Sequence, residues 1–182
     1  MSQLQYLMIQ IFLKDMEKFE DLDKVLDASS LKKEIVPGYH VCEAVVLTKN
    51  EKQPISLYSK IYSCASKDFI SMNKYTHDSI DAVRKVLNRK CNMIFDRGYD
   101  DNKIIDYVDK TENYFVIRIN DDRTFYFKNK RKKCYDVAIR RKGKVKMTLW
   151  FDDNEEHDVY ISHTKVRLPY NKKDYELVIV YG

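Results

Sequence analysis

The chain has 182 residues, which is enough for one complete domain or for one domain that carries an insertion. Its 14 Tyr and 8 Phe argue against a disordered chain, and no apolar run approaches the roughly 18 residues of a membrane-spanning helix. With a modest net charge of +5 and no secretion-signal pattern at the N-terminus, we expect a cytoplasmic protein that does not act in a membrane.

The first third of the chain predicts one helix and two strands. Apolar side chains recur at helical spacing across residues 16–26, which favours an amphipathic helix. Pro37-Gly38 predicts a turn, and the mostly apolar residues 39–48 predict a strand after it. A polar hairpin loop at 49–53 then leads to an antiparallel return strand at 54–62.

The middle of the chain alternates between helices and strands. The clearest helix opens at Thr76, which can serve as its N-cap, and Lys and Arg crowd its last turn. A short apolar strand at 93–95, a helix at 102–109 and a strand at 114–119 follow it. This order of elements predicts an α/β fold.

Asp96 is the first candidate for a functional residue, because it directly follows the apolar strand at 93–95. Ligands of open α/β sheets bind outside the carboxyl ends of the strands, and Gly98 lets the chain turn away without a side chain. We expect Asp96 at the C-terminal end of a central strand, beside the strand at 39–48 or the strand that should precede Gly38. The alternative is that Asp96 only caps the turn or the following helix.

The last third of the chain changes character and predicts a β meander. Five short apolar segments are separated by charged turns and show no helical period between them. They lie at residues 124–128, 135–140, 144–151, 158–163 and 176–181.

Positive charge is concentrated between Arg123 and Lys146, where Asp136 is the single acid. This run predicts a patch that contacts the phosphates of double-stranded DNA, and the alternative is a solvated face of the protein. The aromatic residues Tyr126, Phe127 and Tyr135 could stack on bases or belong to the core. The candidate DNA contacts are Lys128, Lys130, Arg131, Lys132, Lys133, Arg140 and Arg141.

The run Phe95-Asp96-Arg97-Gly98-Tyr99-Asp100, with the helix and strand that follow it, resembles a known family. It is similar to the region around the second catalytic aspartate of bacterial insertion-sequence transposases of the DDE type. Residues 38–41, 54–60 and 71–73 resemble elements of the same domain, so the likeness spans roughly Asp15 to the C-terminus. The resemblance implies a ribonuclease-H-like mixed α/β core at 1–120 and a basic β-rich insertion at 121–182, whose last strand returns to the core.

In this family three carboxylates hold two divalent metals, Mg²⁺ or Mn²⁺, for in-line attack on a phosphodiester. The resemblance makes Asp96 the second of these carboxylates, a catalytic residue and a metal ligand. Residues 4–13 contain no acid for the first position, and the family's glutamate pattern for the third is not found. Four acids follow this apolar run, but none of them has neighbours that resemble those of the family's first aspartate. They are Asp15, Asp21, Asp23 and Asp27. We therefore expect a transposase whose catalytic site is incomplete, either a truncated or decayed element or a chain whose missing parts lie in a neighbouring reading frame.

Smaller signals have two interpretations each. Some relatives use a tryptophan to hold a flipped base, which would make Trp150 a DNA contact, although a Trp between Leu and Phe also fits a core. His157 and His163 stand among acids and could form a metal site or be ordinary loop histidines. The four irregularly spaced cysteines predict reduced thiols, with neither a zinc site nor a disulfide framework.

Two other functions remain open from the sequence. The chain could be a non-catalytic DNA-binding or interaction module that competes with an intact transposase or pairs with it or with a second copy. It could also be an unrelated nuclease, which would place a second carboxylate beside Asp96.

Overall fold

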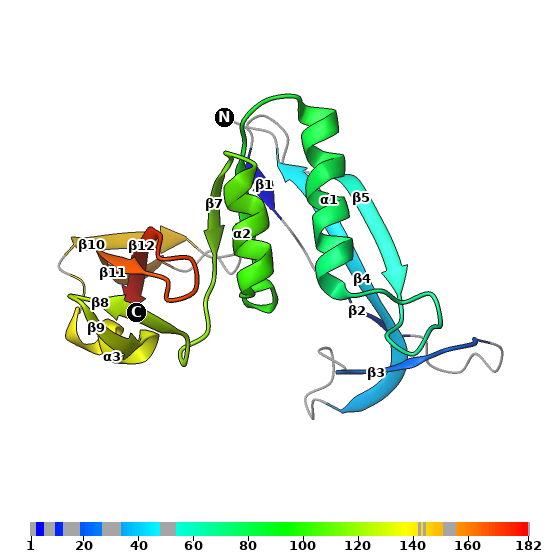
Figure 1. The fold of residues 1–182 in the computed structure, drawn as a ribbon, viewed down its shortest axis with the longest axis horizontal. Coiled ribbons are helices and arrows are strands. Elements are labelled where there is room, and N and C mark those ends of the chain that lie inside the picture. The colour runs from blue at the N-terminus through cyan, green and yellow to red at the C-terminus, as the bar shows by residue number, and fades with distance from the viewer. Residues whose placement is uncertain are drawn as a thin grey trace. The chain divides into compact units, whose positions relative to one another are not determined.

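The computed structural model describes residues 3–5, 10–12, 19–26, 34–47, 54–141, 143, 145–150 and 156–181 (Figure 1). The chain divides into two compact units, Met1–Arg118 and Ile119–Gly182. The first contains a seven-stranded mixed sheet with two helices, and the second contains a five-stranded antiparallel sheet with one helix. No helix in these described ranges is long and apolar enough to cross a membrane. The architecture is mixed α/β, as predicted.

The long strand β4 (Ile35–Leu47) organises the sheet of the first unit. Along one edge it pairs with β1 (Gln3–Gln5) and β2 (Gln10–Phe12), which keep one common register against it. Along the other edge it pairs with β3 (Asp23–Leu26) and β5 (Ile55–Tyr62). All four pairings are antiparallel, and β5 confirms the predicted return strand. The predicted loop at 49–53 lies outside the described residues.

Strand β6 (Asn92–Phe95) lies between β1 and β7 (Tyr114–Ile117) and is parallel to both. This confirms the expectation that the strand before Asp96 has a neighbour on each side. The neighbour toward β4 is β1, so the strand predicted at 39–48 is one position further away. Because β1 and β6 run in the same direction, their carboxyl ends meet at one edge of the sheet. The strand order β5-β4-β1-β6-β7, with β4 alone antiparallel to β1 and β5 and the other neighbours parallel, is of the ribonuclease-H-like type, as predicted.

Helices α1 (Met72–Leu87) and α2 (Asn102–Lys110) lie beside each other against this sheet (Figure 1). The prediction that α1 begins at Thr76 is wrong, because Ser71 accepts a hydrogen bond from Lys74 N at 3.1 Å and caps the helix one turn earlier. Thr76 is buried inside the helix and donates to a backbone carbonyl. Asn88, in the left-handed region, ends α1.

The core of the first unit lies between the two helices and the sheet. Apolar side chains from α1, α2, β4 and β6 meet there and leave less than a tenth of their surface exposed. Burying such side chains is the main favourable contribution to folding. The buried members are Ala44, Val46, Ile80, Val83, Cys91, Met93, Phe95, Tyr99, Ile104 and Val108.

Two predictions for the N-terminal third are wrong. Residues 23–26 form β3 and not a helix, because Val25 is buried in a strand pairing opposite Val36. Pro37-Gly38 lies inside β4 and makes no turn, since neither residue has a positive φ and the fixed φ of proline suits extended backbone. The remainder of the predicted helix, 16–18, lies outside the described residues.

The second unit is antiparallel throughout. Its strands follow the order β10, β11, β8 and β9 across the sheet, and β12 pairs with β11. The meander prediction is confirmed for the three consecutive strands β10 to β12. The elements are β8 (Thr124–Phe127), β9 (Lys130–Lys133), α3 (Cys134–Arg140), β10 (Val145–Trp150), β11 (Glu156–Arg167) and β12 (Asp174–Tyr181).

The strand predicted at 135–140 is wrong, because these residues belong to helix α3. Cys134 and Val137 are both buried and three residues apart, which places them on one face of a helix. The hydroxyl of Tyr181 donates to the carbonyl of Ala138 and links α3 to β12. A segment of seven residues is too short for its period to separate helix from strand.

Most of the basic run after Phe127 forms strand β9, and only its first two residues form a turn. Lys128 and Asn129 have φ values of 49° and 61°, and they form the tight turn between β8 and β9. Positive φ at both central positions is the geometry that two-residue hairpins favour. The chain then continues as Lys130–Lys133, antiparallel to β8.

Candidate functional site

Asp96 lies directly after the central strand β6 and is exposed. Phe95, its neighbour in sequence, is 1% exposed, and Tyr99 on the other side is 3% exposed. The rings of these two residues pack at 5.7 Å and hold the short 3₁₀ turn Arg97–Tyr99 against the core. The carboxylate of Asp96 is therefore fixed at its base and open to solvent at its tip.

The alternative that Asp96 serves only as a cap is not supported by its contacts. Its backbone occupies the N-cap position of the turn, but its side chain makes no capping hydrogen bond. Helix α2 is capped instead by Asp101, which accepts from Lys103 N at 2.7 Å. The Asp96 carboxylate thus remains available to a ligand.

Among the described residues, the acids that a two-metal site needs do not form a close group with Asp96. Asp23 lies on β3, three strands away from β6, which corresponds to about 14 Å across the sheet. In the ranges that the structure describes, no group of three close His, Cys, Asp or Glu ligand atoms includes Asp96. Asp15 and Asp27 lie outside those ranges. The donor set found here does not fit a pair of metal ions.

In the second unit, part of the predicted basic patch lines a hollow of about 700 Å³. Lys128, Arg140 and Arg141 line this hollow together with Phe127. Lys128 Nζ lies 5.7 Å and Arg141 Cζ lies 5.4 Å from the centre of that ring. Cations held over an aromatic face keep their charge and present it to a ligand from a fixed position.

The four cations of β9 lie beside this hollow in sequence but do not line it. Lys130, Arg131 and Lys133 are exposed, while Lys132 is half-buried opposite Phe125. Alternation along a strand divides the four cations between the two faces of the sheet. The structure thus divides the predicted patch into two groups of cations, one that lines the hollow and one along β9.

The remaining predicted contacts differ in their placement. Tyr126 and Tyr135 are exposed, as stacking on a base would require, while Phe127 is half-buried. Trp150 ends β10, but its side chain lies outside the described residues. The metal hypothesis for His157 and His163 is wrong, because six residues along the extended strand β11 separate them by about 20 Å.

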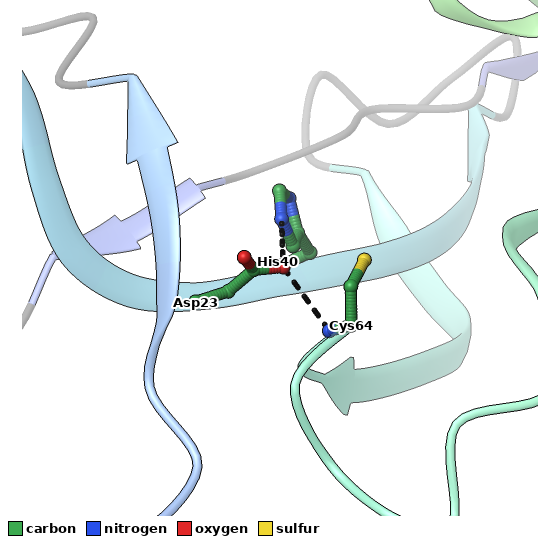
Figure 2. Close-up of side chains that lie close together, drawn as sticks. All are labelled: Asp23, His40 and Cys64. Atoms are coloured by element: carbon green, nitrogen blue, oxygen red, sulfur yellow. Dashed lines mark hydrogen bonds and ion pairs between the residues drawn. The ribbon is translucent and has the colours of Figure 1, made fainter.

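Sequence reasoning missed a second cluster, formed by Asp23, His40 and Cys64 (Figure 2). His40 Nε2 lies 3.2 Å from Asp23 Oδ2, and the backbone N–H of Cys64 donates to the same oxygen at 3.1 Å. Lys24 N donates to the other carboxylate oxygen at 2.7 Å. Spacings of this length follow no local motif, so only the strand pairing reveals the cluster.

Strand register explains why these three side chains meet. Asp23 on β3 lies opposite Gly38 of β4, and His40 is two residues further along the same face. On the other part of that edge, His40 lies opposite Tyr62 of β5, and Cys64 follows two residues later. The even spacing along β4 places His40 on the same face as Gly38, opposite Asp23, and the turn after β5 brings Cys64 to Asp23, whose carboxylate accepts the Cys64 N–H.

The charges of the cluster depend on one another. Desolvation would raise the pKa of Asp23, but hydrogen bonds from the Cys64 thiol, the Lys24 and Cys64 amides and His40 lower it overall. Three effects raise the pKa of Cys64 to about 11. They are desolvation of the thiol, its hydrogen bond to Asp23 and the negative charge of the Asp23 carboxylate. At neutral pH the metal-free cluster therefore holds a carboxylate and a protonated thiol.

This raised pKa predicts slow alkylation of Cys64 by iodoacetamide. At pH 8 the raised pKa leaves about 100-fold less of Cys64 as thiolate than in a free cysteine. A thiolate of higher pKa is about tenfold more nucleophilic, so we expect alkylation of Cys64 to be about tenfold slower than that of a free thiol. Mass spectrometry of the Cys64 peptide measures the rate under native conditions. Cys42, Cys91 and Cys134 are buried and serve as unreactive internal references. Asp23→Asn should accelerate the reaction, and a wild-type rate equal to that of a free thiol would disprove the shift.

Comparison with known proteins adds one match. The family model described as "Transposase DDE domain" matches residues 70–172, which is more than half of the chain. The matched segment runs from the start of α1 to the turn before β12 and contains Asp96, β9 and all the residues that line the hollow. No curated protein matches the chain.

Proposed function

Because the chain belongs to the transposase DDE domain family, we propose that it acts on transposon DNA through Asp96 and the basic residues of its second unit. The observation that carries this proposal is the position of Asp96. Its carboxylate is exposed, makes no capping hydrogen bond, and lies at the carboxyl end of a central strand that is parallel to both neighbours. In this proposal residues 1–120 form a partial ribonuclease-H-like core, and residues 121–182 form a basic β-rich insertion.

Asp96 would supply one ligand to the divalent ions that this family generally uses, Mg²⁺ or Mn²⁺. A bound ion would stabilise the charge that develops on the phosphodiester oxygens. Around Asp96 the described residues offer no complete ligand set, so in this proposal the remaining ligands come from outside these residues. The described residues themselves fix the Asp96 carboxylate in position and bring cations to the DNA backbone.

The basic residues support binding to the phosphates of duplex DNA. Lys128, Arg140 and Arg141 converge at the hollow, and β9 adds a strand of exposed charge. Phosphate contacts of this kind position a protein on DNA without reading its sequence. Tyr126 and Tyr135 offer exposed rings for stacking where the duplex is opened.

DNA binding that falls steeply with salt is the test of this interface. With about five phosphate contacts, the logarithm of the affinity should fall with the logarithm of salt concentration at a slope of about −4 to −5. Fluorescence anisotropy of a labelled duplex measures this slope. Changing Lys130, Arg131, Lys132 and Lys133 to Glu should reduce binding below detection. Changing Lys128, Arg140 and Arg141 to Glu measures the contribution of the hollow separately.

A matched control uses four exposed cations near the end of α1, Arg84, Lys85, Arg89 and Lys90. Changing these four residues to Glu alters the net charge by the same amount as the β9 variant. We expect the control to retain most of its affinity, since an interface depends on where the charges lie. Equal loss of DNA affinity in both variants would show that binding depends on net charge alone. Unchanged DNA binding in the β9 variant would show that the β9 cations serve only to keep the protein soluble.

The lone carboxylate also favours a second function. A chain that binds transposon DNA and brings an incomplete acid set would compete with an intact transposase for DNA, or pair with it or with a second copy. Adding the chain to an intact transposase distinguishes these outcomes, because competition lowers strand transfer at limiting DNA. Inhibition that excess DNA does not relieve would indicate pairing between the proteins.

A further inference from the structure

The Asp23, His40 and Cys64 cluster is separate from the place where Asp96 lies. Gln5 of β1 pairs with Ile94 of β6 on one side and with Val45 of β4 on the other, so these residues lie in one row across the sheet. His40 lies five residues before Val45 along β4. Asp23 is on β3, at the outer edge of β4, three strands from β6. A carboxylate at this position cannot share an ion with Asp96, so the cluster needs an explanation of its own.

The cluster combines the three side-chain types that bind zinc most often. A carboxylate oxygen, an imidazole nitrogen and a sulfur all lie within 4.8 Å of one another. Tetrahedral zinc, with bonds of about 2.0–2.3 Å, places its ligand atoms about 3.3–3.8 Å apart. The 3.2 Å between His40 Nε2 and Asp23 Oδ2 already matches that spacing closely. Figure 2 shows the three side chains converging from β3, β4 and the segment after β5.

A catalytic cysteine is the main alternative, and the geometry opposes it. In a Cys-His-Asp nucleophile the imidazole lies between the thiol and the carboxylate, so that it can take the thiol proton. Here Asp23 lies in the middle and contacts both His40 and Cys64. A carboxylate beside the sulfur also favours the protonated thiol over the reactive thiolate.

We propose that Asp23, His40 and Cys64 bind one Zn²⁺ ion with tetrahedral geometry, with water in the fourth position. The ion takes one carboxylate oxygen, His40 Nε2 and the Cys64 sulfur, and the thiol proton leaves to solvent. One carboxylate and one thiolate balance the two positive charges of the ion. Asp23 and His40 leave 22% and 17% of their side-chain surface exposed, so an ion can enter without unfolding the sheet.

Zinc at this place would cross-link three segments that are already joined by strand pairing and by the hydrogen bonds of Asp23. β3 is four residues long and pairs with β4 in the described part of the chain, while Cys64 follows the end of β5. An ion that binds only the folded state stabilises it in proportion to the logarithm of its concentration. The melting temperature of the chain should therefore rise as free zinc is added.

Cobalt substitution tests the site directly on the full-length, reduced chain. We expect one equivalent of Co²⁺ to give a near-ultraviolet thiolate charge-transfer band and the visible bands of a tetrahedral ion, and Zn²⁺ to bleach both. Competition with a chromophoric chelator then measures the zinc affinity. Cys64→Ser should abolish the charge-transfer band. It should also weaken zinc binding at least about tenfold, because losing even a partner outside the ligand shell typically costs 10- to 100-fold.

The matched control is the pair His163 and Glu176, whose atoms also lie 3.2 Å apart but which has no thiol beside it in the described residues. His163→Gln should leave the cobalt spectrum and the zinc affinity unchanged, whereas Asp23→Asn and His40→Gln should weaken both. A second readout uses the wild-type chain alone, in which zinc should protect Cys64 from alkylation. A wild-type chain without the charge-transfer band, or a band that survives Cys64→Ser, would overturn the proposal and leave a hydrogen-bonded cluster.

Discussion

Supercoiled plasmid that carries transposon ends should remain uncut when it is incubated with this chain and Mg²⁺ or Mn²⁺. A two-metal reaction needs several carboxylates at fixed positions, and in the described residues no group of three close ligand atoms includes Asp96. Losing a single preorganised electrostatic element typically costs about 10²- to 10³-fold in rate. The loss of two such elements places the rate below detection. Gel electrophoresis, scored for nicked circles over several hours, measures the result.

The control for this experiment is Asp96→Asn, which keeps the size of the side chain and removes its charge. Asp96 is exposed and its side chain makes no capping bond, so the variant should fold normally. Nicking by the wild-type chain that disappears in this variant would contradict the expectation. That result would mean that acids outside the described residues complete a working site. Nicking that persists in the variant would come from a contaminating nuclease.

Phe95→Ala should destabilise the first unit by about 3–5 kcal/mol, which is the usual cost of replacing a buried phenylalanine by alanine. Phe95 is 1% exposed, belongs to the core between β6 and both helices, and packs against Tyr99. Domains have a total stability of only about 5–15 kcal/mol, so this single change removes a large share of it. Urea denaturation followed by circular dichroism measures the loss.

Two further probes separate the units in the same titration. Trp150 is the single tryptophan and belongs to the second unit, so its fluorescence reports on residues 119–182. Cys42 and Cys91 are buried in the first unit, and their reaction with a thiol reagent reports on residues 1–118. Asp96→Asn should change stability by no more than about 0.5 kcal/mol. A loss below about 1 kcal/mol for Phe95→Ala would refute the assignment of Phe95 to the core.

The middle of the fold could be predicted because its signals are local. The strand before Asp96 and helix α2 both show a clear apolar pattern over their full length. The same pattern placed Asp96 at a strand end without any knowledge of its partners. The start of α1 was missed because two possible caps, Ser71 and Thr76, lie five residues apart. Burial of Tyr75 against the sheet decides between them.

The errors occur where distant residues determine local structure. Apolar residues recur at helical spacing across 16–26, but pairing with β4 makes residues 23–26 a strand. Residues 135–140 look like a strand, but they form helix α3, which buries Val137 and accepts a hydrogen bond from Tyr181 at Ala138. The Asp23, His40 and Cys64 cluster depends on two strand registers at once. Neither composition nor motif spacing encodes a contact of this kind.

The basic strand β9 has a consequence for how the protein remains monodisperse. In the described part of the chain β9 pairs with β8 alone, so it forms an outer edge of the second sheet. Unpaired backbone groups on such an edge can recruit a strand from another molecule, and lysines there oppose this through charge repulsion. Replacing the four cations with Thr or Val, rather than Glu, would therefore invite edge-to-edge association between copies. The same residues that we assign to DNA thus also keep the sheet edge closed to other strands.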